Sequence, residues 1–194
     1  MEHLEILKIE SRIPHNNEVI DLDLISMPKL RTVTLMGTPI QKVPECIPKL
    51  QSLVELYISV NKFTEDPMQS LKSLPNLLSL YLHVFNYEGC FHFEDGCFQK
   101  LKELSLSCFI KLREVVINKG TLPSLKKLEF SDLSGLKNIP IGIQHLDELI
   151  ELCMVNMSNE FVQNISTEDW NLMQLVPLVH ITDIYDDTIP IPWS

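Results

Sequence analysis

A short apolar pattern that recurs along the chain limits its possible folds more than any other feature. The pattern is apolar-x-x-apolar-x-apolar, and its copies begin at residues 4, 30, 53, 77, 101, 125, 149 and 176, so the interval is 23 to 27 residues. A further apolar residue stands three positions before seven of these starts and keeps the same phase. Periods of roughly 20–50 residues are the signature of solenoids, in which each repeat is one structural unit. The apolar triplets are Leu4/Leu7/Ile9, Leu30/Val33/Leu35, Leu53/Leu56/Ile58, Leu77/Leu80/Leu82, Leu101/Leu104/Leu106, Leu125/Leu128/Phe130, Leu149/Leu152/Met154 and Val176/Val179/Ile181.

The last two apolar positions of each copy are two residues apart, which places both side chains on one side of an extended segment. Leu104 and Leu106 then point inward, whereas Glu103, Ser105 and Ser107 point to the other side. A single copy cannot bury its apolar side, but stacked copies form a parallel sheet over one continuous core. The sequence therefore predicts an α/β fold: a leucine-rich solenoid of about eight repeats, with a curved parallel sheet on the concave face and irregular turns and short helices on the convex face.

The segments between the strands are rich in residues that interrupt regular structure, as at Pro39, Pro44 and Pro48, and turns are expected there. A helix is expected from Ser158 to Ser166, with Ser158 as its N-cap. The stretch from Asn86 to Gly96 departs from this pattern because aromatic residues alternate along it.

Two further expectations concern side chains beside the strands. In the stretch 86–96, Phe91 and Phe93 are expected to pack inward, since alternating aromatic residues are most often core; a recognition loop is the less favoured alternative. After the third apolar position, Thr38 and Asn61 are suited to a hydrogen-bonded polar ladder. The residues in the equivalent place in later repeats are apolar, so local irregularity is expected there: Phe85, Phe109, Leu133 and Met157.

The repeat length and strand motif are typical of leucine-rich-repeat proteins. From Leu74 to about Phe161 the chain resembles, more narrowly, the late repeats of plant nucleotide-binding leucine-rich-repeat (NLR) resistance proteins of the coiled-coil class. Two motifs carry most of this resemblance. They are Phe-x-x-Gly-x-Phe-x-x-Leu-x-x-Leu from Phe93 to Leu104 and Leu-Lys-x-Ile-Pro-x-Gly-Ile-x-x-Leu from Leu136 to Leu146.

The resemblance implies a role that periodicity does not show. In such receptors the repeats sense a pathogen effector or a guarded host protein, and they restrain a nucleotide switch domain through an intramolecular contact. None of the six glycines here begins the Gly-x-x-x-x-Gly-Lys-Ser/Thr loop that cradles phosphate, so no nucleotide-binding domain and no cofactor are expected in this chain. We expect one repeat domain over residues 1–194, with regular repeats over about 4–175 and a last strand and cap over 176–194, as a fragment of a longer receptor.

Composition narrows the partners and the compartment. The formal net charge of -10, from 26 acidic and 16 basic residues, disfavours nucleic acid and anionic membrane surfaces and favours a basic protein partner. No apolar stretch is long enough to span a bilayer and no signal peptide is apparent. The five cysteines are odd in number and lack paired close spacing, which indicates reduced thiols in a cytoplasmic protein.

The candidate binding residues are those that the strand pattern places on the concave face. Tyr57 and Tyr81 stand in the same position of neighbouring repeats and are expected to form one aromatic patch, a common anchor of protein interfaces. Acidic residues concentrate toward the later repeats and favour a basic partner, although a charged row is often only a solvated face. The complete candidate set is Glu55, Tyr57, Tyr81, His83, Glu103, Ser105, Lys127, Glu129, Glu151, Cys153 and His180.

The sequence gives little support for catalysis or for metal binding. Cys153 and His180 share one row in adjacent repeats, so a thiol and an imidazole could meet there, but an open sheet offers no enclosed pocket and no oxyanion device. We therefore expect no enzyme. Cys90, His92 and Cys97 could supply soft ligands, but their spacing matches no standard zinc module and a fourth ligand is not evident, so no metal is expected.

Two other functional classes remain open. An extracellular repeat receptor is favoured slightly by two formal glycosylation acceptors, Asn156-Met157-Ser158 and Asn164-Ile165-Ser166. The missing signal peptide and the absence of paired capping cysteines oppose it. A free-standing scaffold of the Ras-signalling repeat type is the other alternative, which the resemblance of the late repeats opposes.

Overall fold

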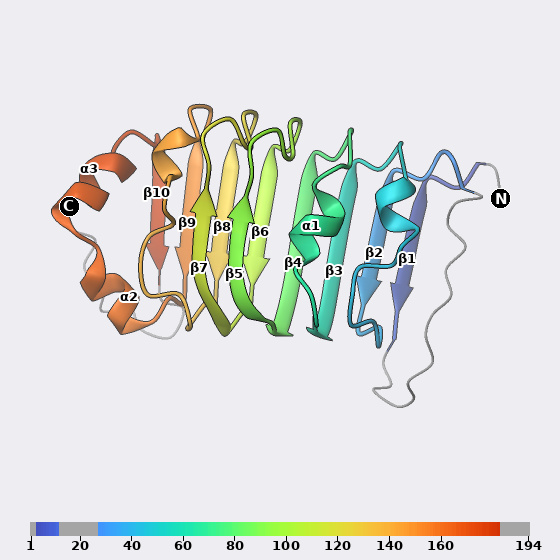
Figure 1. Ribbon diagram of the computed structural model, residues 1–194, viewed down its shortest axis with the longest axis horizontal. Coiled ribbons are helices and arrows are strands. Elements are labelled where there is room, and N and C mark those ends of the chain that lie inside the picture. Colours follow the sequence, from blue (N-terminus) through green and yellow to red (C-terminus); the bar gives the residue numbers. More distant parts are fainter. Residues whose placement is uncertain (1–2, 12–26, 183–194) are drawn as a thin grey trace.

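The computed structural model describes residues 3–11 and 27–182, and these form a parallel solenoid (Figure 1). Eight strands make one sheet in the order β1-β2-β3-β4-β6-β8-β9-β10, and every neighbouring pair is parallel. The predicted α/β leucine-rich solenoid is confirmed. The strands are β1 (Ile6–Glu10), β2 (Thr32–Met36), β3 (Glu55–Lys62), β4 (Ser79–Asn86), β6 (Glu103–Ser107), β8 (Lys127–Ser131), β9 (Glu151–Val155) and β10 (Leu178–Thr182).

The strands pair in the register that the leucine pattern predicts. Leu56, Leu80, Leu104, Leu128 and Leu152 follow one another across five adjacent strands, and each is at most 1% exposed. Full burial of one such side chain stabilises a fold by about 1.5–3 kcal/mol, so this column is a main source of cohesion between repeats. In β1 and β10, at the two ends of the sheet, the same positions are only half-buried, because each of these strands has one neighbour in place of two.

The length of each strand depends on one residue, which stands two positions after the third apolar residue of the repeat pattern. At four of these places the backbone has a positive φ, which turns the chain off the sheet after a strand of five residues: Gly37, Cys108, Asp132 and Asn156. The equivalent residues of β3 and β4 are Val60 and Val84. A β-branched side chain disfavours positive φ, so both strands run on to eight residues.

This difference in length explains why the polar ladder is incomplete, as the sequence predicts. Asn61 accepts a hydrogen bond from the Asn86 side chain of β4 at 3.4 Å, but Thr38 takes no part in a ladder. In repeats that turn early, the next residue points into the core, and Thr38, Phe109, Leu133 and Met157 are all buried. The Thr38 hydroxyl has no hydrogen-bond partner among the described residues. In β3 and β4 the same place points outward, so Asn61 and Phe85 are exposed. The position is thus mainly a core position, and the register of the sheet stays regular through every repeat.

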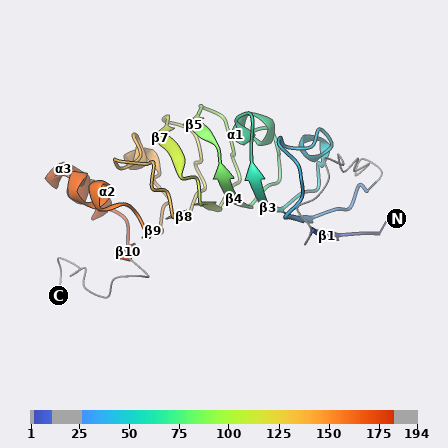
Figure 2. The same cartoon turned by 90° about the horizontal axis from the view of Figure 1, so that it is seen from below.

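A second parallel sheet, which the sequence did not predict, lies on the convex side. It consists of β5 (Glu88–Phe93) and β7 (Lys111–Ile117), and Figure 2 shows it on the side opposite the main sheet. Phe91 and Phe93 are at most 1% exposed, which confirms the prediction that they pack inward. The Val116–Ile141 bridge extends the pairing into the following repeat.

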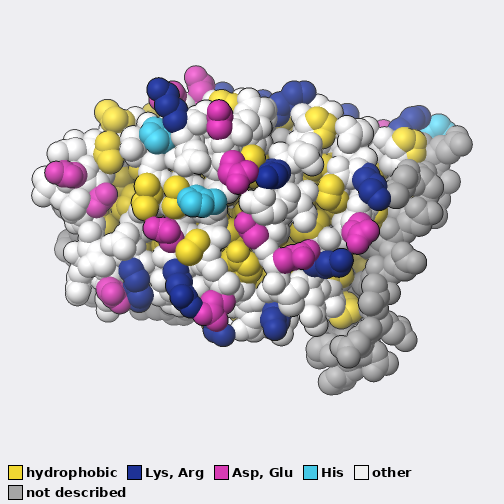
Figure 3. Space-filling view, viewed as in Figure 1, with side chains coloured by type: hydrophobic (Ala, Val, Ile, Leu, Met, Phe, Trp, Pro, Cys, Tyr) yellow, Lys and Arg dark blue, Asp and Glu magenta, His cyan; other side chains and the backbone are white. Residues whose placement is uncertain are grey.

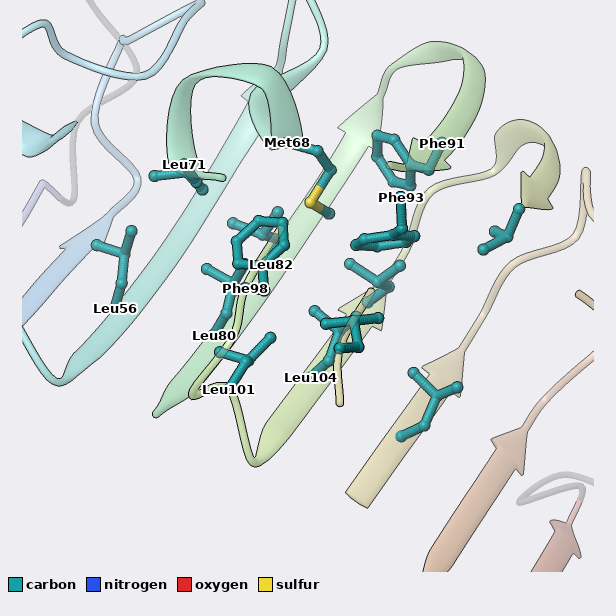
Figure 4. Close-up of a cluster of buried hydrophobic side chains, with 14 of the residues drawn as sticks. Leu56, Met68, Leu71, Leu80, Leu82, Phe91, Phe93, Phe98, Leu101 and Leu104 are labelled. Carbon is teal, nitrogen blue, oxygen red and sulfur yellow. The ribbon is translucent and has the colours of Figure 1, made fainter. Parts of the chain in front are cut away.

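The core fills the space between the two sheets. Met68 and Leu71 enter it from the short helix α1 (Pro67–Leu71), which Asp66 caps by accepting a hydrogen bond from the backbone N–H of Met68 at 2.8 Å. Figure 4 shows these two side chains turned toward leucines of the sheet, with Phe91 and Phe93 beside them. Apolar side chains from strands, helix and convex segments therefore form one core.

Short helical segments complete the convex side and the last repeat. The 3-10 turns η2 (Ile47–Lys49) and η3 (Ile143–His145) occupy two crossings. The predicted helix is confirmed as α2 (Asn159–Asn164), with the Ser158 hydroxyl accepting from the backbone N–H of Phe161 at 3.2 Å. A further helix, α3 (Thr167–Met173), was not predicted. The expected cap beyond Thr182 lies outside the described residues.

Candidate protein-binding surface

The candidate surface is the concave face of the main sheet. The first, third and fifth residues of the strands point away from the core there, and Figure 2 shows no described helix or strand over this side. We call the third residues the central row. From β1 to β10 they are Lys8, Thr34, Tyr57, Tyr81, Ser105, Glu129, Cys153 and His180, each facing its neighbour in register.

Tyr57 and Tyr81 lie side by side in the middle of this row. Their ring centroids are 6.3 Å apart and the ring planes are inclined by 35°. Both side chains are partly exposed, with apolar rings that no described element covers. The predicted adjacency of the two tyrosines is therefore confirmed; their use in binding remains a prediction.

Tyr81 is held by an acidic neighbour on the next strand. Its phenol donates a hydrogen bond to the Glu103 carboxylate at 2.5 Å. Burial and this hydrogen bond raise the pKa of Tyr81 to about 12, so the phenol stays protonated at neutral pH. The ring is fixed by its hydroxyl, and its apolar face remains available to a partner.

His83, the fifth residue of β4, lies beside a hydroxyl and an aromatic ring. Its Nδ1 is 2.9 Å from the Ser107 Oγ, and its ring meets the Phe85 ring edge to face at 4.9 Å. Burial lowers the pKa of His83, although the nearby Asp132 carboxylate opposes this effect. The imidazole is therefore mainly neutral at pH 7 and adds little positive charge to the concave face.

The acidic row predicted for the later repeats is present, and part of it is neutralised. Lys127 pairs with Glu151 across β8 and β9, with the ammonium 3.0 Å from the carboxylate. Glu129 accepts a hydrogen bond from the Ser105 hydroxyl at 3.4 Å. Glu55 is exposed at the start of β3. The glutamates of the concave face thus lie on β3 beside Tyr57 and on β6, β8 and β9 beyond Tyr81.

Cys153 and His180 face each other in register between β9 and β10. The Cys153 thiol donates to Glu151 at 3.2 Å, and burial with this carboxylate raises the pKa of Cys153 to about 11. A nucleophilic cysteine needs the opposite environment, because the thiolate is the reactive form. The geometry therefore gives no support to the catalytic alternative.

Thiol reactivity should separate Cys153 from Cys90. Cys90 is exposed on β5, whereas Cys153 is buried. Raising the pKa from 9.0 to about 11 lowers the thiolate fraction by about 100-fold. Maleimide at pH 7.5 should therefore label Cys90 rapidly and Cys153 much more slowly, as peptide mapping by mass spectrometry will measure. Cys90→Ser should remove the rapid phase, and denaturant should expose all five thiols; rapid labelling of Cys153 in the folded protein would contradict this assignment.

Two further features raised by the sequence are a metal site and two glycosylation acceptors. Cys90 and His92 are exposed whereas Cys97 is buried, and no three His, Cys, Asp or Glu side chains in the described ranges are arranged to hold a metal. At the two glycosylation acceptors the side-chain amides are engaged: Asn156 donates to Asp132 at 3.1 Å and Asn164 donates to the Lys137 carbonyl at 3.0 Å.

The sequence missed one group of surface residues at the carboxyl ends of the strands. Asp132 accepts from Ser131 at 2.9 Å and from Asn156 at 3.1 Å, and Phe85 is 44% exposed near His83. Asp and Asn adopt a positive φ more readily than most residues, so Asp132 and Asn156 after apolar strands could have indicated this edge.

The fold and its open concave sheet define a leucine-rich-repeat solenoid. The chain matches the family described as leucine-rich repeat region over residues 1–175, and it belongs to that family. It is 32% identical over 146 residues to the disease resistance protein RPM1 of Arabidopsis thaliana, covering 75% of this chain and 16% of that protein. Disease resistance RPP8-like protein 3 of the same plant is 26% identical over 170 residues, or 86% and 18% of the two chains.

These relatives confirm the resemblance to plant disease-resistance proteins. A third, disease resistance protein RPH8A of Arabidopsis thaliana, is 27% identical over 171 residues, covering 85% of this chain and 18% of that protein. The similarity extends well beyond the stretch from Leu74 to Phe161 that first indicated it. The chain spans about a sixth of the length of these relatives. Among the described helices, none combines the length and the apolar character that a bilayer crossing requires.

Proposed function

We propose that this chain is the ligand-sensing repeat domain of a plant immune receptor, which binds a protein partner on its concave face in defence against pathogens. The observation that carries the proposal is the uncovered Tyr57–Tyr81 pair, set among acidic side chains on a rigid parallel sheet. Tyrosine is enriched among the residues that dominate protein interfaces. The partner would be a pathogen effector or a guarded host protein, as the similarity to disease resistance proteins suggests.

Three further parts of the proposal rest on the same similarity. The 194 residues would act as one repeat domain, and in a full-length receptor this domain would also restrain a nucleotide switch domain. The domain would act by binding, not by catalysis. We place it in the cytoplasm, and the cysteines agree with a reducing compartment, because none of the five forms a disulfide.

Replacing Tyr57 and Tyr81 by alanine should remove most partner binding and leave the fold intact. Immobilised chain would be incubated with extracts of healthy and infected leaves, and proteins retained by the wild type and lost by the double variant would be identified. With one such protein purified, calorimetric titration should show a loss of about 2 kcal/mol or more, or roughly 30-fold in affinity.

The matched control carries two alanines on the convex sheet, His92→Ala with Glu114→Ala, where both side chains are exposed. It should bind as the wild type does. Circular dichroism should show unchanged thermal unfolding for both double variants. If the wild type and the tyrosine variant retain the same proteins with equal affinity, the concave face is not the binding surface and the proposal fails.

A further inference from the structure

The concave face carries acidic groups that the protein does not neutralise by itself. On its first, third and fifth strand positions from β3 to β9, the charged residues are four glutamates and Lys127, and Lys127 is paired with Glu151. The other three glutamates form no ion pair within the described part of the chain. They are Glu55, Glu103 and Glu129.

Two glutamates of the convex side are paired with cations. Glu88 pairs with Arg113 between β5 and β7, and Glu94 pairs with Lys72 at 3.0 Å. Figure 3, which shows the side with α1, β5 and β7, has Lys and Arg side chains interspersed among Asp and Glu side chains. Glu88 and Glu94 are thus neutralised by cations, whereas Glu55, Glu103 and Glu129 are not, and these three lie on the face that no described element covers.

The three glutamates stand around the tyrosine pair. Glu55 precedes Tyr57 by two residues on the same strand and therefore shares its side of the sheet. Glu103 accepts from the Tyr81 hydroxyl, and Glu129 lies two strands beyond Tyr81 in the central row. The residues between them are short serines, Ser79 and Ser105, so the tyrosine ring faces and the carboxylates are open to the same incoming side chain.

One kind of side chain suits this combination. A guanidinium group stacks on aromatic faces and makes two parallel hydrogen bonds with a carboxylate, whereas an ammonium group is a more strongly hydrated point charge. A cation over a tyrosine ring gains about 0.5–2 kcal/mol, depending on its exposure. Aromatic rings beside unpaired carboxylates therefore complement arginine better than lysine or an apolar residue.

We propose that the concave surface from β3 to β8 binds an arginine-containing basic segment of a protein partner, with guanidinium groups over Tyr57 and Tyr81 and against Glu55, Glu103 and Glu129. This inference rests on the proposed function and narrows the partner's chemistry. Glu55 and Glu103 stand two strands apart, about 9.6 Å. A peptide in the polyproline II conformation has three residues per turn and rises about 3.1 Å per residue. Arginines at positions i and i+3 of such a peptide lie on the same side, about 9.3 Å apart, and match this distance.

The test uses fluorescein-labelled nine-residue peptides with three arginines at every third position among serines and glycines. Matched peptides carry lysine or glutamate at the same positions. Fluorescence anisotropy at low salt should show that the arginine peptide binds the full chain at least 5-fold more tightly than the lysine peptide, and that the glutamate peptide does not bind. Raising the salt to 0.5 M should weaken binding, because the contacts are ionic.

The matched variants separate local recognition from overall charge. Glu55→Gln with Glu103→Gln and Glu129→Gln should weaken arginine-peptide binding at least 10-fold. The convex control, Glu88→Gln with Glu94→Gln and Glu114→Gln, changes the net charge equally and should stay within 2-fold of wild type. Tyr57→Ala with Tyr81→Ala should reduce the preference for arginine over lysine.

Several results would overturn the inference: equal loss in the two triple variants, equal binding of the arginine and lysine peptides, or preference for the glutamate peptide. Self-association in sedimentation that disappears in the concave triple variant would assign the surface to a second copy of the chain. These failures are distinguishable from failure of the proposed function. A leaf protein that still depends on Tyr57 and Tyr81 would keep the concave face as an interface while rejecting an arginine-containing segment as its ligand.

Discussion

Replacing Phe91 by alanine should lower the free energy of unfolding by about 3–5 kcal/mol, the range for removing a large aromatic side chain from a packed core. Phe91 is fully buried in β5. Its ring stacks on Tyr87 with the centroids 5.0 Å apart, and it meets the edge of Phe109 at 5.2 Å. Alanine would leave a cavity between these rings and remove two aromatic contacts, each worth about 0.5–1.5 kcal/mol beyond its buried area.

The position of this cluster in the solenoid makes the loss local as well as large. Phe91 comes from β5, and Phe109 lies in the turn before β7, so the cluster joins the second sheet to the core. Each repeat of a solenoid contacts mainly its neighbours, so opening should begin at the weakened repeat. Hydrogen exchange should accelerate first in β5 and β7, before it does in β2 or β9.

Phe85→Ala is the matched control, since it removes the same side chain from a surface position that is 44% exposed. Surface substitutions usually change stability by about 0.5 kcal/mol or less. Urea unfolding followed by circular dichroism will compare the two variants with the wild type. Equal effects of Phe91→Ala and Phe85→Ala would contradict the assignment of the aromatic cluster as the anchor of the second sheet.

The eight strands and their register could be predicted because one physical constraint is repeated in every unit. Leu80 and Leu104 must both be buried, and a shift of one residue would move either strand's apolar side to the solvent. The same constraint is sufficient to predict from the sequence that Tyr57 lies beside Tyr81. The positions of surface residues are thus predictable when buried residues of the same strands fix the register of the sheet.

The second sheet could not be predicted in this way, because β5 and β7 occur in convex crossings that have no equivalent in the other repeats. Inward packing of Phe91 and Phe93 was readable from their alternation, but their pairing partner in β7 lies about one repeat further along the chain. Leu112, Val115 and Ile117 in β7 have the apolar-x-x-apolar-x-apolar spacing of the main strands, but they stand out of phase with the repeat and do not identify β5 as their partner. Pairing between non-periodic segments depends on tertiary contacts, which local patterns do not contain.

The incomplete polar ladder has a cause of its own. Residues at the position of Thr38 do not form one column, because the backbone of the preceding residue decides whether each side chain points inward. Gly37 and Asp132 take a positive φ and turn the next side chain into the core, whereas Val60 keeps the strand extended and turns Asn61 outward. The signal was present in the sequence as a contrast between β-branched and turn-forming residues. This signal lies one position earlier, at Gly37 before Thr38 and at Val60 before Asn61.

The second large effect is expected at Gly142, in the crossing that follows β8. Its φ is +85°, and a Cβ atom there would lie 2.0 Å from the backbone oxygen of Ile117. The adjoining backbone also pairs with β7, since Ile141 exchanges hydrogen bonds with Val115 and Ile117 at 2.9 and 2.8 Å. A side chain at Gly142 must therefore push this crossing away from β7, where the neighbouring contacts hold it.

Gly142→Ala should lower the free energy of unfolding by about 2–4 kcal/mol, combining roughly 1–2 kcal/mol of left-handed strain with the loss of one or two backbone hydrogen bonds at about 1 kcal/mol each. Gly96→Ala is the matched control, because Gly96 has a similar φ of +82° and no atom within 4 Å of the added Cβ. It carries the strain alone, partly offset by about 0.4–1 kcal/mol from the stiffer unfolded chain. Urea unfolding of both variants will measure the difference. If the two alanines cost the same, the close approach of Gly142 to Ile117 contributes nothing, and strand β7 does not hold the following repeat in place.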